Sequence, residues 1–170
     1  DPKTVNLSAE ILDKTLNSIR NNKFIIPVHF GGLPCDMKRI KKIGDKTNSV
    51  IIEDAAHALG SKYSDGSMVG NCKYSDATVF SLHPVKIIAA GEGGIITTNN
   101  LITYKKLLKF RSHGIIKEEG LYKSKNAKTG KFINPWYYEI QELGFHYRLT
   151  DIQSSLAISQ LRKINLFVKK

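Results

Sequence analysis

Lys86 is the residue whose surroundings in the sequence most clearly suggest chemistry. It lies in FSLHPVKIIAAGEGG, Phe80 through Gly94, between apolar neighbours and just before a glycine cluster. A charged ammonium among apolar side chains has a desolvation cost, which favours the neutral amine that attacks an aldehyde. The alternative is an ordinary lysine at a strand end whose head group reaches solvent. The residue type alone leaves both interpretations open.

Asp54 and Ser81 could complete a site around that amine. Asp54 ends the apolar run SVIIED, and Ser81 precedes Lys86 by five residues. A carboxylate at a strand end can bind magnesium, act as a base, pair with a cationic ring or simply cap a loop. Side chains alternate along a strand, so we expect Glu53 and Asp54 not to share one ligand. An amine, a carboxylate and a phosphate-binding hydroxyl together are typical of a pyridoxal phosphate site.

The elements that would position these groups follow from hydrophobic periodicity. Helical spacing and capping residues, with Ser8 and Thr150 as N-caps, predict helices over 9–22, 35–47, 101–114 and 150–164. Short apolar runs predict strands over 23–30, 49–54, 76–83 and 93–99, buried on both faces. This alternation predicts an α/β layer whose ligands bind beyond the carboxyl ends of the strands. The polar segment 115–140 has no clear period and is expected to be a functional or partly disordered loop.

Composition limits the classes of protein to consider. The chain has 170 residues, 41% of them hydrophobic and 24% charged, which suits one globular domain. The net charge of +11 comes from scattered lysines that indicate a solvated surface more than a nucleic-acid groove. No apolar run predicts a membrane span or a secretory leader. Cys35 and Cys72 lack metal-ligand spacing, so we expect a reducing cytoplasmic location, with neither a disulfide framework nor a metal site.

Four ordered motifs resemble one known family. IIEDAAHALGSKYSDGSMVG, DATVFSLHPVKIIAAGEGGIITTNN, LLKFRSHGI and ELGFHYRLTDIQSSLAISQLRKI are similar to segments of the DegT/DnrJ/EryC1/StrS sugar aminotransferases. The resemblance implies a fold-type-I pyridoxal phosphate enzyme with an aspartate aminotransferase-like large domain, its mainly parallel sheet flanked by helices. Residues 1–170 would be a central part of that domain. The N-terminal part and the small C-terminal domain would lie outside the chain.

The same resemblance implies roles for five residues. Lys86 would bind the cofactor aldehyde and shuttle a proton, Asp54 would pair with the pyridinium nitrogen, and Ser81 would bind the phosphate. His57 stands where the family usually has glutamine near the ring oxygen. His146 stands where an asparagine commonly reaches the phosphate from the neighbouring subunit, so both histidines are departures from the pattern.

The expected activity is transfer of an amino group from L-glutamate to a nucleotide-linked 4-keto-6-deoxy sugar. The likeness is greatest to members of the pseudaminic-acid pathway, and relatives that dehydrate sugars carry histidine in place of Lys86. The full-length protein is expected to be a homodimer, and this fragment alone to bind cofactor weakly. The alternatives are a non-catalytic regulator that binds the cofactor and a basic nucleic-acid-binding domain. His29, His83 and His113 are expected to be structural.

Overall fold

The computed structural model describes residues 1–19, 23–129 and 131–169. The chain divides into two compact units, one formed by Asp1–Asn99 with Thr150–Lys170 and the other by Asn100–Leu149. Within the described ranges, no helix is both long enough and apolar enough to cross a bilayer. Residues 20–22, at the end of the first predicted helix, lie outside the described residues.

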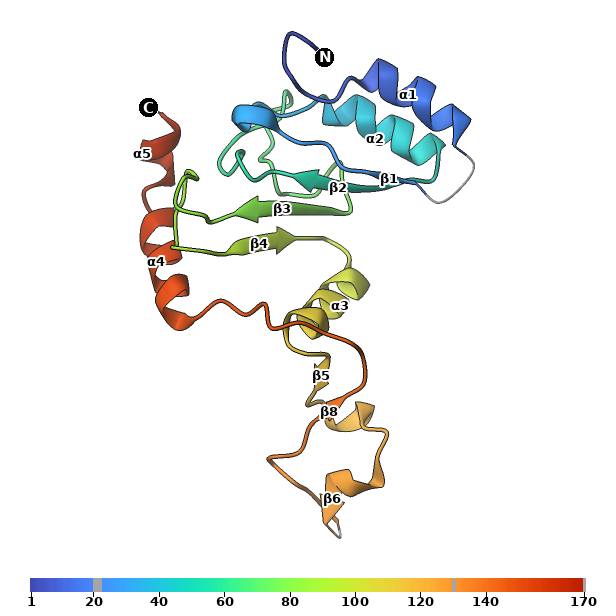
Figure 1. Ribbon diagram of the computed structural model, residues 1–170, viewed down its shortest axis with the longest axis vertical. Helices are drawn as coiled ribbons and strands as arrows, with labels where there is room; N and C mark the ends of the chain where they lie inside the picture. Colours follow the sequence, from blue (N-terminus) through green and yellow to red (C-terminus); the bar gives the residue numbers. More distant parts are fainter. Residues whose placement is uncertain (20–22, 130, 170) are drawn as a thin grey trace. The chain divides into compact units, whose positions relative to one another are not determined.

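A four-stranded sheet in the order β1-β2-β3-β4 forms the centre of the first unit (Figure 1). Its strands are β1 (Phe24–Ile25), β2 (Val50–Asp54), β3 (Ala77–Ser81) and β4 (Gly94–Thr97). The first three strands are parallel, and β4 is antiparallel to β3. The predicted fold class, a mainly parallel sheet flanked by helices, is therefore confirmed.

Two helices, α1 (Ala9–Ser18) and α2 (Met37–Lys46), lie side by side over one face of this sheet (Figure 1). The Ser8 hydroxyl accepts a hydrogen bond from the Ile11 N–H and caps α1, as predicted. Leu12 and Leu16 of α1 pack in one hydrophobic core with Ile51 of β2. Each such buried side chain stabilises the fold by about 1.5–3 kcal/mol.

The predicted strand over 23–30 differs from expectation. Only Phe24–Ile25 forms a regular strand, followed by a single bridge between Val28 and Asp54 and a 3-10 turn at Phe30–Gly32. Ile25 is 2% exposed, whereas Phe24 is 64% exposed and Ile26 is 59% exposed. The prediction of burial on both faces is wrong, because α1 and α2 cover only one face and the pleat sends alternate side chains to the other.

The last two helices belong to the same unit. Helix α4 (Asp151–Leu161) begins with a capping box between Thr150 and Gln153, and the short helix α5 (Ile164–Val168) follows it. The helix predicted over 150–164 is thus confirmed, although a break near residue 162 divides it. Helix α5 packs closely on Gly60, where an added Cβ would approach Val168 Cγ2 to 2.8 Å.

The second unit contains helix α3 (Leu101–Arg111) and two small antiparallel pairs. The pairs are β5 (Ile115–Ile116) with β8 (Glu139–Ile140) and β6 (Lys128–Thr129) with β7 (Phe132–Ile133), and 3-10 turns lie at Glu119–Leu121 and Lys125–Ala127. The helix confirms the predicted element. Its expected apolar face is exposed instead, with Leu101 64% exposed and Tyr104 50% exposed, because this small unit has few elements to cover it.

Two glycines allow close contact between backbones in the second unit. Gly114 has φ 69°, and a Cβ added there would collide with the Glu142 carbonyl oxygen. A Cβ on Gly144 would collide with the Gly114 nitrogen. This contact brings the segment after α3 alongside the segment that carries His146. His146 forms an isolated antiparallel β-bridge with Ser112.

Candidate functional site

Asp54 lies at the carboxyl end of β2 with its backbone fixed from both sides. Its N–H donates to the Pro27 carbonyl (2.9 Å), and its carbonyl accepts from the His29 N–H (3.0 Å). On the other side, the Ala55 N–H donates to the Val79 carbonyl of β3 (2.8 Å). The half-buried Asp54 carboxylate accepts from the Ala56 N–H (3.1 Å), an Asx turn that directs the chain away from the strand.

Ser81 lies at the same edge of the sheet and on the same face as Asp54. Asp54 is paired with Val79 in the parallel register, and Ser81 is two residues beyond Val79. Because paired residues point to one side and side chains alternate, all three share a face. The opposite face carries the buried pair Glu53 and Thr78. The prediction that Glu53 and Asp54 point to opposite faces is confirmed.

Lys86 follows β3 in a loop that leaves this edge of the sheet. Its N–H donates to the His83 carbonyl (2.9 Å), and the loop is anchored by the nearly inaccessible side chains of Leu82 and Ile88, each 1% exposed. Lys86 is half-buried, but its neighbour Val85 is 78% exposed. The expected apolar enclosure by sequence neighbours is therefore wrong. The turn directs Val85 to solvent, so any desolvation of the amine must come from other parts of the protein or from a ligand.

His57 is exposed in the turn that follows Asp54. Its ring lies edge-to-face with Phe30, with 6.2 Å between the ring centroids. The structure thus places His57 three residues beyond Asp54 on the same strand-to-loop connection.

His146 belongs to the second unit, so the structure describes it apart from the other four residues. Its exposed ring is edge-to-face with His113, at 5.0 Å between centroids. The guanidinium of Arg148 lies 3.0 Å from His146 Nε2. A guanidinium can only donate, so Nε2 accepts and the ring proton is on Nδ1. His146 therefore presents an N–H donor from its remaining nitrogen.

A buried polar cluster beside Asp54 was not predicted from the sequence. The Glu53 carboxylate, 0% exposed, accepts hydrogen bonds from His29, Tyr63, Ser75 and Thr78. His29 is accordingly a hydrogen-bonded structural histidine, as expected. The available clue was a glutamate on the buried face of an apolar strand, a position that requires hydrogen-bonding partners.

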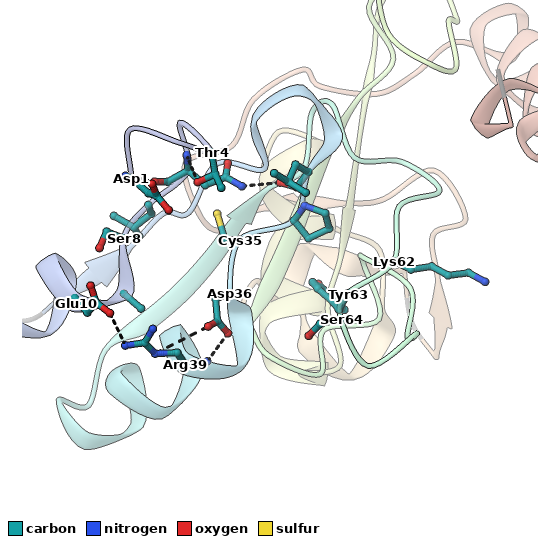
Figure 2. A pocket seen from close by; sticks show the side chains of 15 residues that line it. Asp1, Thr4, Ser8, Glu10, Cys35, Asp36, Arg39, Lys62, Tyr63 and Ser64 are labelled. Atoms are coloured by element: carbon teal, nitrogen blue, oxygen red, sulfur yellow. Dashed lines mark hydrogen bonds and ion pairs between the residues drawn. The ribbon is translucent and has the colours of Figure 1, made fainter.

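The first unit also contains a cavity of about 590 Å³, to which Tyr63 of the buried cluster contributes (Figure 2). Residues from the start of the chain, from the segment before α2 and from the loop after β2 line it, among them Asn6, Cys35, Arg39 and Tyr63. Two of its charged side chains, Arg39 and Glu10, pair at 3.3 Å. None of the predicted site residues lines this cavity. The open face at the ends of β2 and β3 is therefore the better candidate site.

Comparison with known proteins identifies relatives of this chain. Over all its 170 residues the chain is 39% identical to an uncharacterised protein of Methanocaldococcus jannaschii, covering 41% of that protein. It is 38% identical over 143 residues to a UDP-4-amino-4,6-dideoxy-N-acetyl-β-L-altrosamine transaminase of Campylobacter jejuni, which is 84% of this chain and 33% of that enzyme. The chain thus spans about two fifths or less of these curated relatives.

Solved structures show the same relationship in three dimensions. Helicobacter pylori PseC, an aminotransferase of pseudaminic acid biosynthesis, superposes with a TM-score of 0.79 and 31% identity over 95% of this chain and 38% of its own. The PLP-form of the putative sugar aminotransferase Spr1654 from Streptococcus pneumoniae gives 0.77 and 27% identity, covering 98% and 42%. The family description that matches residues 1–170 is that of the DegT/DnrJ/EryC1/StrS aminotransferases. With its fold, its four motifs and its full length all matching, the chain belongs to the DegT/DnrJ/EryC1/StrS aminotransferase family.

Proposed function

We propose that the protein containing this chain is a pyridoxal phosphate-dependent aminotransferase that moves an amino group from L-glutamate to a nucleotide-linked 4-keto-6-deoxy sugar. The observation that carries this proposal is the grouping of Asp54 and Ser81 on one face and edge of the sheet, with Lys86 in the loop that leaves it. The activity of the Campylobacter relative and the pathway of PseC support the sugar substrate.

The donor set of this chain fits pyridoxal phosphate. A carboxylate suits a protonated ring nitrogen, a hydroxyl suits a phosphate oxygen, and a primary amine suits an aldehyde. When bound, the cofactor supplies that aldehyde and a ring that stabilises the electron pair of the substrate carbon. Residues 1–170 would then be a partial large domain, with the remaining part of the site outside the chain.

Each residue has a definite role in this proposal. Asp54 holds the ring nitrogen in its protonated form, and Ser81 donates to the phosphate. Lys86, as the neutral amine, would carry the proton between the substrate carbon and the C4′ carbon of the cofactor. His57 donates to the ring oxygen. His146 donates its Nδ1 proton to the phosphate of the partner subunit's site, in a homodimer.

Two further features of the protein belong to the proposal. Both cysteines, Cys35 and Cys72, are free and buried, which supports a reducing cytoplasmic location. A lysine at position 86, where sugar-dehydrating relatives have histidine, supports amino transfer over dehydration.

Covalent trapping tests the role of Lys86. In the complete polypeptide incubated with pyridoxal phosphate, borohydride reduction should add one phosphopyridoxyl group to the Lys86 peptide, located by mass spectrometry. Lys86→Ala should lose this label and reduce amino transfer by at least a thousandfold, because no other group supplies both the covalent link and the proton transfer. Lys62→Ala, an exposed lysine in the same unit, is the matched control. Labelling of another lysine in the wild type would refute the assignment.

The substrate and the regulator alternative are tested together. Glutamate should convert bound cofactor to its pyridoxamine form, and a panel of nucleotide keto sugars should then show which one gains the amino group by mass spectrometry. A protein that binds the cofactor but never forms the pyridoxamine form would be a regulator, contrary to this proposal.

A further inference from the structure

The buried carboxylate of Glu53 accepts four hydrogen bonds. His29 Nε2 (2.8 Å) and the Tyr63 hydroxyl (2.6 Å) approach Oε2, while the Thr78 hydroxyl (2.9 Å) and the Ser75 hydroxyl approach Oε1. Burial alone would raise the pKa of this carboxyl, but the hydrogen bonds outweigh it and hold the pKa below its ordinary value. Glu53 is therefore a stable negative charge inside the fold.

His29 has a hydrogen-bond partner at each of its ring nitrogens. Glu53 attracts a proton to the imidazole, but the Cys35 N–H points at His29 Nδ1 at 3.2 Å. A nitrogen that accepts a hydrogen bond holds a lone pair, so the ring proton is on Nε2 and is donated to Glu53. The His29 ring is thus held by a partner at each nitrogen.

Two partners of Glu53, His29 and Thr78, come from the segments that hold the backbone of Asp54. His29, which donates to Glu53 through its ring, donates to the Asp54 carbonyl through its backbone N–H (3.0 Å). Thr78 is paired with Glu53 in β3, next to Val79, which is paired with Asp54. One carboxylate on the buried face therefore joins the two neighbouring segments between which Asp54 is held.

We propose that Glu53 is a positioning residue that fixes the end of β2, so that the Asp54 carboxylate on the opposite face is held against the cofactor ring nitrogen. This inference rests on the proposed function, because it takes Asp54 as the partner of that nitrogen. Replacing Glu53 by glutamine keeps the size of the side chain but places an amide NH₂ among four donors. At least one partner must give up its hydrogen bond or reverse it, and the strand end that carries Asp54 loosens.

The experiment measures the ring nitrogen directly. The complete polypeptide is loaded with ¹⁵N-labelled pyridoxal phosphate, and the ring-nitrogen chemical shift is followed with pH while cofactor affinity is measured by fluorescence. In Glu53→Gln we expect the shift to move toward the unprotonated value and the affinity to fall about tenfold, the factor that corresponds to 1.4 kcal/mol. Asp54→Asn should move the shift further in the same direction.

Asp76→Asn is the matched control. The Asp76 carboxylate accepts from the Ile51 N–H (2.8 Å) near the start of the same strand. An amide oxygen is a weaker acceptor than a carboxylate, so the substitution weakens β2 away from Asp54. The ring-nitrogen shift should not change in this variant. An equal change in Asp76→Asn and Glu53→Gln would overturn the inference, since general loosening of the strand would then explain both.

A gentler pair of variants covers the case in which Glu53→Gln does not fold. Tyr63→Phe removes one donor to Glu53 and should give a smaller change of the same sign. Tyr74→Phe removes a hydroxyl that donates to exposed Asp65 (2.8 Å) and should give none. An unchanged ring-nitrogen shift in Tyr63→Phe would overturn the inference. If the wild type fails to form the Lys86 adduct, the proposed function fails; if it forms the adduct and the variants show no change, only the role of Glu53 fails.

Discussion

Glu53 in the first unit and Glu139 in the second each collect several hydrogen bonds, but in opposite surroundings. Glu53 is 0% exposed, and all its donors are side chains. Glu139 lies partly exposed, and its carboxylate binds the backbone N–H groups of Lys123 (2.9 Å) and Ser124 (2.8 Å), together with Gln141 Nε2 (2.6 Å). The first carboxylate joins elements of a sheet, and the second closes a loop.

The difference teaches that similar sets of hydrogen bonds can contribute unequally to the stability of the fold. Backbone hydrogen bonds from Lys123 and Ser124 lower the pKa of Glu139 to about 2, and the pKa of Glu53 is lowered as well. The donors around Glu139 can turn to water when the carboxylate is removed. Those around Glu53 cannot, so they would remain buried without a partner.

Removing the buried carboxylate should have the largest effect. We expect Glu53→Ala to lower the free energy of unfolding by about 3–5 kcal/mol, because the buried donors His29, Tyr63 and Thr78 lose their acceptor. Urea denaturation of the complete polypeptide measures this loss. Glu139→Ala, measured in parallel, should cost less, and equal losses in the two variants would contradict the comparison.

The contribution of Glu53 to stability should also appear in the pH dependence of the free energy of unfolding. A carboxyl whose folded-state pKa is lowered stabilises the fold above its unfolded value, near 4.5, and this contribution is lost as pH falls through the folded pKa. The wild type should therefore lose stability below about pH 4.5. Glu53→Gln should show a shallower decline over this range, measured by urea denaturation at several pH values. Parallel curves for wild type and variant would show that Glu53 does not contribute.

The smallest effect on overall stability should come from Glu139→Gln. We expect little change in the denaturation midpoint but faster hydrogen exchange at the Lys123 and Ser124 amides, because the glutamine side chain is a weaker acceptor than a carboxylate. Glu142→Gln, which removes a surface ion pair with Lys109 at 2.9 Å, should leave those two amides unchanged. Unchanged exchange in Glu139→Gln would mean that this carboxylate does not hold the loop closed.

Local patterns predicted most elements of the fold, and long-range contacts explain the failures. Ser8 and Thr150 begin helices where their capping chemistry placed them, and the strand that ends at Asp54 was predicted nearly to the residue. Burial of the segment after residue 23 was not predictable, because hydropathy does not show which face of a sheet receives a helix.

The sequence predicted where the candidate site residues lie on the strands, but it did not predict the buried contacts beside them. Strand-end placement of Asp54 and Ser81 follows from periodicity, whereas the roles of these residues remain predictions. The apolar neighbours of Lys86 were misleading, because a turn exposes Val85. The donors to Glu53 are as far as 25 residues away along the chain, so only the folded protein brings them to it.

The contact between Arg148 and His146 has a consequence for molecular recognition. The asparagine that commonly stands at this position in the family carries both a carbonyl oxygen and an amide NH₂. It can therefore either accept a hydrogen bond from an incoming group or donate one to it. The Nε2 lone pair of His146 is occupied by the Arg148 guanidinium 3.0 Å away, so His146 can only donate a hydrogen bond. Position 146 is consequently a hydrogen-bond donor only. It can bind oxygen atoms that bear negative charge, but it cannot accept a hydrogen bond from a hydroxyl group.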